Sequence, residues 1–424
     1  MLFSLKDCNI CVVGLGYVGL PLALEFSKKF NVIGYDTDKN RIKQLSEGCD
    51  RNSEVSNLQV KSSNINFVSA LQPNCEANVY IITVPTPVDG NKSPDLSILK
   101  KVSRTIGRVL SVGDAVIYES TVYPGVTEDV CVPILTRESG LTLNTDYFVG
   151  YSPERINPGD KSRELSSIMK VTSGSTEDAA EFIDQLYSSI ISAGTHKAPS
   201  IRIAEAAKVI ENVQRDVNIA LMNEFSSIFD SLAIDTHDVL EAAKTKWNFI
   251  PFQPGLVGGH CIGVDPFYLI HKADEVGAPA KLMKEARNIN DGMPLFVVQK
   301  LERLCDLKNI NPQKMRILIL GCSFKENCSD TRNSLVMPLF RLLTDRFMKV
   351  EIEDHVVDAE DVMTTYGIKI NTSSYNFYDI VILAVPHDTI IEGGVDKIKS
   401  RLATNGIFFD LKSVFDSSCS DLRL

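Results

Sequence analysis

The chain has 424 residues, of which 44% are hydrophobic, and its 44 Lys and Arg against 54 Asp and Glu give a formal net charge of −10. This acidic balance argues against nucleic acid as the main partner, because phosphate binding needs clustered Lys and Arg that the sequence lacks. The length predicts two or three domains, since one domain usually holds about 100–200 residues.

Ten cysteines are scattered along the chain, which favours reduced thiols and a cytoplasmic protein. Residues 10–24 are apolar or Gly/Pro, yet three glycines interrupt them and Glu25 and Lys28 follow, so we expect no export signal. No apolar window is long enough to span a membrane. The pair Cys8 and Cys11 lies in or beside an apolar strand without a second ligand pair, so we interpret both as packing residues and predict no metal site.

The first predicted elements are a buried strand at residues 9–13, a glycine turn and a helix from about Tyr17. Further apolar runs of strand length lie in residues 31–36, 77–87 and 114–122, with helical segments between them. This alternation predicts a parallel sheet covered on both faces. We assign residues 1–199 to a doubly wound α/β domain.

The turn reads Gly14-Leu15-Gly16-Tyr17-Val18-Gly19, and Asp36 ends the following strand. Glycines at this spacing allow a tight turn and a close approach of pyrophosphate to a helix N-terminus, where Asp36 can accept hydrogen bonds from ribose hydroxyls. Because a carboxylate there repels a 2′-phosphate, the pattern predicts NAD rather than NADP. A purely structural glycine turn is the alternative.

Two later segments follow strands of the same domain: STVYPG at 120–125, and GYSPERINPG at 150–159 with Glu154. Ligands of open α/β sheets bind at the carboxyl ends of the strands. We therefore interpret Glu154 as a binding or catalytic residue, with an ordinary surface acid as the alternative.

Residues 200–232 are almost free of Gly and Pro, and apolar residues recur every three or four positions (Ile203, Ala207, Ile210, Val217, Leu221, Phe225, Ile228). This predicts a long helix, followed by helices over 236–244 and 279–306, in a helical middle domain at residues 200–306. Lys208 and Asn212 share one face of the long helix. The sequence leaves open whether Lys208 is solvated or partly withdrawn from water.

The middle domain also contains GLVGGHCIGVD at 255–265, where Cys261 lies among four glycines. Glycines admit backbone and ligand to short distances at an entropic cost, so we favour a reactive thiol over a packing residue. His260 has no partner imidazole at ligand spacing and is interpreted as structural.

From Lys314 onward, strand-like runs again alternate with helices, and YDIVILAVP at 378–386 echoes ANVYIITVP at 77–85. The glycine fingerprint is absent, so we predict a second nucleotide-binding-like domain at residues 307–424 for another ligand. Its loop at 321–334 carries Lys325 and Arg332, which can hold a phosphate or carboxylate.

Seven motifs in this order resemble the UDP-glucose/GDP-mannose dehydrogenase family over residues 8 to about 415 (GLGYVGLP, VPTP, ESTVYPG, SPERINPG, AEAAKVIEN, GLVGGHCIGVD, FKENCSDTR). The resemblance implies two Rossmann-like doubly wound parallel-sheet domains, for NAD and for a UDP-sugar, joined by a helical domain with a long central helix. It implies a four-electron oxidation of the sugar C6 alcohol to a carboxylate by two NAD⁺, and at least a homodimer.

Carried over residue by residue, the resemblance makes Cys261 the nucleophile that forms a thiohemiacetal and then a thioester. Lys208 and Asn212 match residues that stabilise the oxyanion at C6. Glu154 matches the acid/base of thioester hydrolysis, assisted by Thr121 and Asp265.

The binding residues carried over in the same way form two sets. Those toward NAD are Gly14, Gly16, Tyr17, Val18, Gly19, Asp36, Arg41, Thr86, Thr121 and Arg332. Those toward the substrate are Glu154, Arg155, Lys208, Asn212, Phe252, Gly255 and Lys325.

Within the family, the chain looks like the branch acting on UDP-N-acetylhexosamines such as UDP-GlcNAc or UDP-GalNAc, with Pro158 where UDP-glucose enzymes carry a second glutamate. It departs from that branch at Lys284 and Glu285, where small apolar residues are usual, and we expect altered packing there. The expected product is a uronate for surface polysaccharide, capsule or O-antigen. The alternatives are a UDP-glucose 6-dehydrogenase and a non-catalytic protein that binds NAD and nucleotide sugar.

Overall fold

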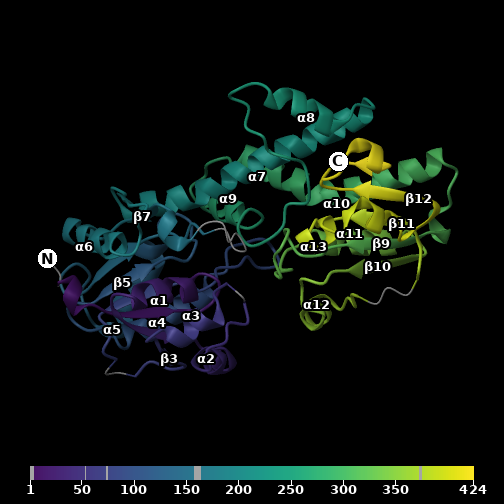
Figure 1. Cartoon of the computed structure of the whole chain (residues 1–424). Coiled ribbons are helices and arrows are strands. Elements are labelled where there is room, and N and C mark those ends of the chain that lie inside the picture. The colour runs from purple at the N-terminus through teal and green to yellow at the C-terminus, as the bar shows by residue number, and fades with distance from the viewer. Residues whose placement is uncertain (1–3, 53, 73–74, 157–163, 372–374) are drawn as a thin grey trace. The chain divides into compact units, whose positions relative to one another are not determined.

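A computed structural model describes residues 4–52, 54–72, 75–156, 164–371 and 375–424. The chain divides into two compact units (Figure 1). The first comprises Met1–Glu211 and Phe267–Ala278, and the second comprises Asn212–Pro266 and Pro279–Leu424.

The first unit is built on a six-stranded parallel sheet with the order β3-β2-β1-β4-β5-β6. Its strands are β1 (Asn9–Val13), β2 (Asn31–Tyr35), β3 (Asn66–Val68), β4 (Val79–Ile82), β5 (Ala115–Tyr118) and β6 (Phe148–Tyr151). The residues of β4 and β5 are all buried, as expected of strands with covered faces. The predicted doubly wound sheet is confirmed.

The helices of this unit are α1 (Gly19–Ser27), α2 (Lys39–Ser46), α3 (Asn57–Ser62), α4 (Ser97–Gly107), α5 (Val132–Ser139) and α6 (Glu177–Ser188). The first helix begins at Gly19, two residues later than predicted. Leu20 and Phe26 of α1 pack into one buried cluster with Ile81 of β4 and Leu186 of α6. The unit also contains a short parallel pair, β7 (Lys170–Thr172) with β8 (Thr195–Lys197). Most of the helix α9 (Asp265–Glu275) belongs to this unit as well.

The long predicted helix is α7 (Ile201–Ser231), but its buried face differs from the apolar pattern in the sequence. Ile203, Ile210, Leu221 and Ile228 are all exposed. The buried polar positions are instead Glu205, Lys208, Asn212, Asp216, Asn223 and Ser226, which recur at helical spacing. The helix therefore buries a polar stripe and exposes an apolar one in the single chain.

The second unit contains a five-stranded parallel sheet with the order β10-β9-β11-β12-β13. The strands are β9 (Arg316–Leu320), β10 (Lys349–Glu353), β11 (Tyr378–Leu383), β12 (Leu402–Asp410) and β13 (Leu422–Arg423). The helices are α8 (Thr236–Lys244), α10 (Lys281–Leu307), α11 (Val336–Thr344), α12 (Ala359–Tyr366), α13 (Asp388–Ile391) and α14 (Gly394–Lys399). The sheet lies in the yellow-green part of the chain in Figure 1.

The predicted repeat of the first unit's architecture is confirmed. The strand β9 lies between β10 and β11, just as β1 lies between β2 and β4. Gly321 follows β9 with φ +82° and Gly14 follows β1 with φ +94°, a left-handed conformation that favours glycine. Although the full fingerprint is absent, the second unit thus keeps the first turn glycine of the motif.

Candidate active site

The glycine turn in the first unit has the geometry of a dinucleotide-binding loop. A Cβ on Gly19 would lie 1.8 Å from the carbonyl oxygen of Gly14, so helix and turn approach closely because no side chain intervenes. A Cβ on Gly16 would meet nothing within 4 Å, which leaves open space for a ligand. Tyr17 and Val18 are both partly exposed at this helix entrance. The turn fits the pyrophosphate of NAD.

Asp36 and Arg41 both hold the backbone of Leu15, inside the turn. The Oδ2 of Asp36 accepts a hydrogen bond from the Leu15 N–H at 2.9 Å, and the Nε of Arg41 donates to the Leu15 carbonyl at 2.9 Å. Arg41 is 2% exposed and pairs with Asp50 at 2.7 Å. Both residues therefore brace the turn, and their contacts with NAD stay predictions.

The predicted residues Thr86 and Thr121 lie together in the first unit. The Thr86 hydroxyl donates to the Thr121 carbonyl oxygen at 2.7 Å. The segment that continues from Thr121 is held by Glu205 of α7, whose carboxylate accepts from the N–H groups of Gly125 at 2.6 Å and Thr127 at 2.9 Å. Burial raises the pKa of Glu205 to about 7. Sequence reasoning missed Glu205.

Glu154 is 8% exposed, so it is not the solvated surface acid that the sequence had left as an alternative. Its Oε1 accepts from the backbone N–H groups of Arg155 at 2.6 Å and Ile156 at 2.5 Å, and its Oε2 lies 3.1 Å from the Nζ of Lys170. The same ammonium lies 2.6 Å from Glu119. The next residues, including Pro158, lie outside the described part of the chain.

Lys208 and Asn212 are both buried, at 7% and 0% exposed. The choice that the sequence left open for Lys208 is thereby decided, since the side chain is withdrawn from water. In the second unit, the amide of Asn212 donates to the Oδ2 of Asp265, and Arg215 donates to the Asn212 Oδ1. Two of the predicted catalytic residues, Asn212 and Asp265, are therefore in direct contact.

Cys261 lies in the loop before α9 and is partly exposed, whereas Cys131 and Cys322 are buried and their pKa values are raised by burial. A Cβ on Gly258 would lie 2.5 Å from the Asn333 carbonyl oxygen, and one on Gly259 would lie 2.6 Å from the Phe324 ring. Packing against the 321–334 loop therefore requires these two glycines. The loop carrying Cys261 thus lies against the loop that carries Lys325 and Arg332.

The start of the Cys261 loop is fixed by Asn223 of α7. The Gly255 N–H donates to the Asn223 Oδ1 at 2.8 Å, and the Asn223 Nδ2 lies 3.1 Å from the Gly255 carbonyl and 2.8 Å from the Oδ1 of Asn290. Seven residues earlier on α7, Asp216 pairs with Arg287 at 2.5 Å, and both side chains are buried. We missed these anchors in the sequence, although the polar positions of α7 recur at helical spacing.

The remaining predicted residues of the second unit lie on loops. Lys325 lines a small hollow with Leu256 and Lys412, and Phe252 is partly exposed. The Arg332 guanidinium bonds the Asp330 carboxylate at 2.6 Å. Burial, with the nearby charge of Arg332, lowers the pKa of His260 to about 4, which fits its interpretation as a structural, neutral residue.

The departure at Lys284 and Glu285 lies on the solvent side of α10, because both side chains are exposed. Ala286 and Arg287, which follow directly, are buried. The two charges therefore occupy positions where water solvates them.

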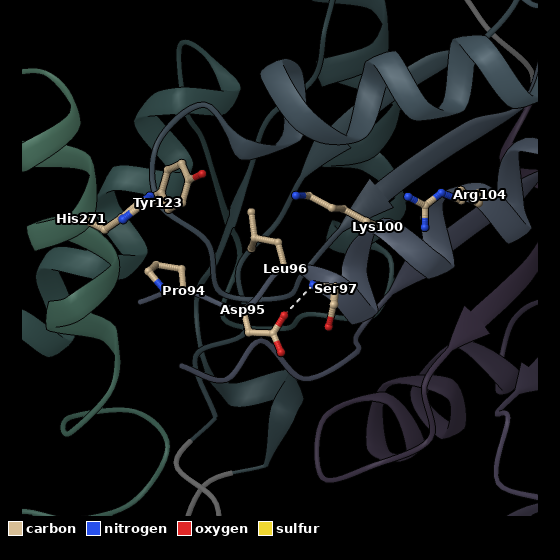
Figure 2. Close-up of a pocket in the computed structure, with 8 residues that line it drawn as sticks. All are labelled: Pro94, Asp95, Leu96, Ser97, Lys100, Arg104, Tyr123 and His271. Carbon is tan, nitrogen blue, oxygen red and sulfur yellow. Dashed lines mark hydrogen bonds between the residues drawn. The ribbon is translucent and has the colours of Figure 1, made fainter. Parts of the chain in front are cut away.

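A separate hollow of about 440 Å³ lies in the first unit, lined by α4, the loop before it, Tyr123 and His271 (Figure 2). At its edge the Ser97 N–H donates to the Asp95 carboxylate at 2.8 Å, the dashed line in Figure 2. Lys100 and Arg104 of α4 bring positive charge to its lining. None of the predicted site residues lines this hollow.

Three domains of one known protein family match the chain. The NAD binding, central and UDP binding domains of the UDP-glucose/GDP-mannose dehydrogenase family match residues 8–191, 202–292 and 318–417. The chain belongs to this family. The UDP-N-acetyl-D-glucosamine 6-dehydrogenase of Pseudomonas aeruginosa is 52% identical over 99% of this chain and 100% of that protein, and the enzyme of that name from Salmonella typhi is 50% identical over 100% of both.

Among solved structures, the UDP-D-ManNAc dehydrogenase from Pyrococcus horikoshii superposes with a TM-score of 0.88 at 29% identity, covering 98% of each chain. The protein is thus an NAD-dependent nucleotide-sugar 6-dehydrogenase that uses NAD as cofactor and a nucleotide sugar as substrate. Across the described residues, no group of His, Cys, Asp and Glu is placed to hold a metal ion, and no helix combines the length and apolar character needed to cross a membrane.

Proposed function

We propose that the enzyme oxidises the C6 alcohol of a UDP-N-acetylhexosamine, UDP-GlcNAc or UDP-GalNAc, to the uronate. The observation that carries this substrate choice is the identity of about half of all residues, over the whole chain, with two enzymes named for UDP-N-acetyl-D-glucosamine. We further propose that the uronate is a precursor of surface polysaccharide, capsule or O-antigen, as the family resemblance implies.

In the proposed mechanism, Cys261 is the nucleophile. Oxidation of the alcohol first removes one hydride and one proton and leaves an aldehyde at C6. The Cys261 thiolate adds to this aldehyde, and loss of a second hydride converts the thiohemiacetal into a thioester. Attack by water then breaks the C–S bond, which releases the carboxylate and regenerates the thiolate. NAD⁺ supplies the oxidising power by accepting one hydride in each oxidation.

The other proposed roles follow from charge and burial. Lys208 is buried, so its ammonium stabilises an oxyanion at C6 more strongly than it would in water, with the Asn212 amide as a second donor. Glu154 takes the proton of the attacking water, with its carboxylate held in place by the backbone N–H groups of Arg155 and Ile156 and by Lys170. Asp265, bonded to Asn212, and Thr121 position the groups around the reacting carbon.

Three further assignments from the sequence remain part of the proposal. The domains are residues 1–199 for NAD, 200–306 for the helical middle and 307–424 for the UDP-sugar. The chain forms at least a homodimer through the middle domain, supported by the exposed apolar positions of α7 (Ile203, Ile210, Leu221, Ile228). We propose that the enzyme acts in the cytoplasm.

The test is a purified-enzyme assay with UDP-GlcNAc, UDP-GalNAc and UDP-glucose, following reduced cofactor. We expect two NADH per N-acetylhexosamine and slower turnover of UDP-glucose. Cys261→Ser should bind NAD but form no uronate, and Cys49→Ser, which changes an exposed cysteine, is the matched control. Full uronate production by Cys261→Ser would refute the covalent role, and preferred turnover of UDP-glucose would refute the substrate.

A further inference from the structure

Glu154 belongs to a buried cluster in which one lysine serves two carboxylates. The Nζ of Lys170, on β7, lies 2.6 Å from the Oε2 of Glu119 and 3.1 Å from the Oε2 of Glu154. The side chains of Lys170 and Glu119 are 2% and 0% exposed, and that of Glu154 is 9% exposed. Glu119 directly follows the strand β5, and Lys170 is the first residue of β7, so the cluster connects these two strands.

The cluster has a charge imbalance. If both carboxylates were ionised, one ammonium would leave a net negative charge almost out of contact with water, which is unfavourable. The two carboxylates therefore compete for the one ammonium. The environments of the two differ, because Glu154 also accepts two backbone N–H groups, whereas Glu119 accepts from the Tyr187 hydroxyl.

Among the described polar groups next to the cluster, Lys170 supplies the positive charge. Tyr187 comes from α6, and burial raises its pKa well above the ordinary value, so its hydroxyl stays a donor. Arg155, the neighbour of Glu154, directs its guanidinium to the Met169 carbonyl at 2.8 Å and to Glu211 at 2.8 Å.

We propose that Lys170 and Glu119 are positioning residues for the hydrolytic base: Lys170 orients the Glu154 carboxylate and supplies its positive charge, and Glu119 competes for the same ammonium. This inference rests on the proposed role of Glu154 in thioester hydrolysis. It gives the two positioning residues opposite effects. Removing the cation should raise the pKa of Glu154, whereas neutralising the competing carboxylate should lower it.

The experiment measures the rate of thioester hydrolysis against pH, from decay of the Cys261 adduct followed by mass spectrometry. In Lys170→Met, the midpoint of the rising limb should move up by about 1–3 pH units, the shift typical of losing an opposite charge at contact. In Glu119→Gln, which preserves a side chain able to bond Lys170 and Tyr187, the midpoint should move down. Lys170→Arg should restore most of the parent profile.

Lys197→Met is the matched control, because Lys197 lies on the neighbouring strand β8 and forms ion pairs with Glu177 and Glu181 outside the cluster. Its profile should equal that of the parent. If Lys170→Met does not fold, the downward shift in Glu119→Gln still tests the proposal. Unchanged midpoints in Glu119→Gln and in any folded Lys170→Met, or shifts in the same direction, would overturn it.

Glu154→Gln separates this inference from the proposed function. Accumulation of the Cys261 adduct in that variant supports Glu154 as the base, and normal hydrolysis refutes that role. Independently of turnover, infrared titration of the Glu154 carboxyl, assigned by its loss in Glu154→Gln, reports the pKa itself. Opposite shifts of this band in the Lys170 and Glu119 variants would uphold the tuning even where Glu154 proved not to be the base, and an unshifted band would reject it.

Discussion

Replacing Asn223 by alanine should disable the Cys261 loop without unfolding the protein. Asn223 is 1% exposed and makes three hydrogen bonds, two with the Gly255 backbone and one with Asn290. Each bond contributes about 1 kcal/mol net, so the loss is about 3 kcal/mol, with more where a buried partner stays unsatisfied. Because two of the bonds hold the start of the loop, the loss should appear as loop opening.

If closure of the loop is required for reaction, about 3 kcal/mol corresponds to a fall of about 150-fold in kcat/KM for the UDP-sugar. We would measure kcat/KM together with hydrogen exchange of the Gly255 amide, which should quicken. Ser227→Ala, at an exposed position on the same helix, is the control. An Asn223→Ala enzyme with parental kcat/KM and parental exchange at Gly255 would refute the argument that this side chain anchors the loop.

Three other predictions concern the cofactor turn, a titrating carboxyl and a buried ion pair. Gly16→Ala should fold normally, since its Cβ meets nothing within 4 Å, but it should bind NAD more weakly in a fluorescence titration. Gly19→Ala should weaken NAD binding and also lower the melting temperature, because its Cβ would clash with the backbone of Gly14. Burial raises the pKa of Asp114 to about 7 from 3.8, so the free energy of unfolding should fall as pH rises from about 4 to 7, because the unfolded chain releases the proton first. Asp114→Asn should remove this pH-dependent contribution to the free energy of unfolding, which amounts to at most about 4 kcal/mol. The same pH dependence of urea unfolding in both proteins would contradict the prediction. Asp216→Ala removes one of the two carboxylates that pair with the buried guanidinium of Arg287, the other being Asp291, and should cost about 3 kcal/mol in urea unfolding, a loss that unchanged stability would disprove.

Much of the fold could be predicted because local pattern and final environment agree. The apolar runs of β4 and β5 are continuous, and both strands are buried within a sheet covered by helices. The glycine turn was equally predictable, since Gly14 and Gly19 are demanded by backbone conformation and close approach that other residues do not allow. The family and its motifs followed from the same residues.

The interior of α7 was not predictable in the same way. Its apolar positions predicted the helix, but Ile210 and Leu221 are exposed, while Asp216 and Asn223 are buried. A polar residue is buried when partners satisfy it, and those partners, such as Arg287 and Asn290, are more than 60 positions away in the sequence. Hydrophobic periodicity records only the transfer of side chains from water, so it misses a face held together by hydrogen bonds.

The sequence alone therefore determined the strand and helix order, the cofactor turn and the enzyme family, because each depends on neighbouring residues or on short motifs. Tertiary structure decided which charges share a partner. Glu119, Glu154 and Lys170 are separated by up to 51 positions and carry no common motif, yet folding brings them into one buried cluster. The energy of such a cluster depends on distance and on exclusion of water, and the chain acquires both only when its strands pack side by side.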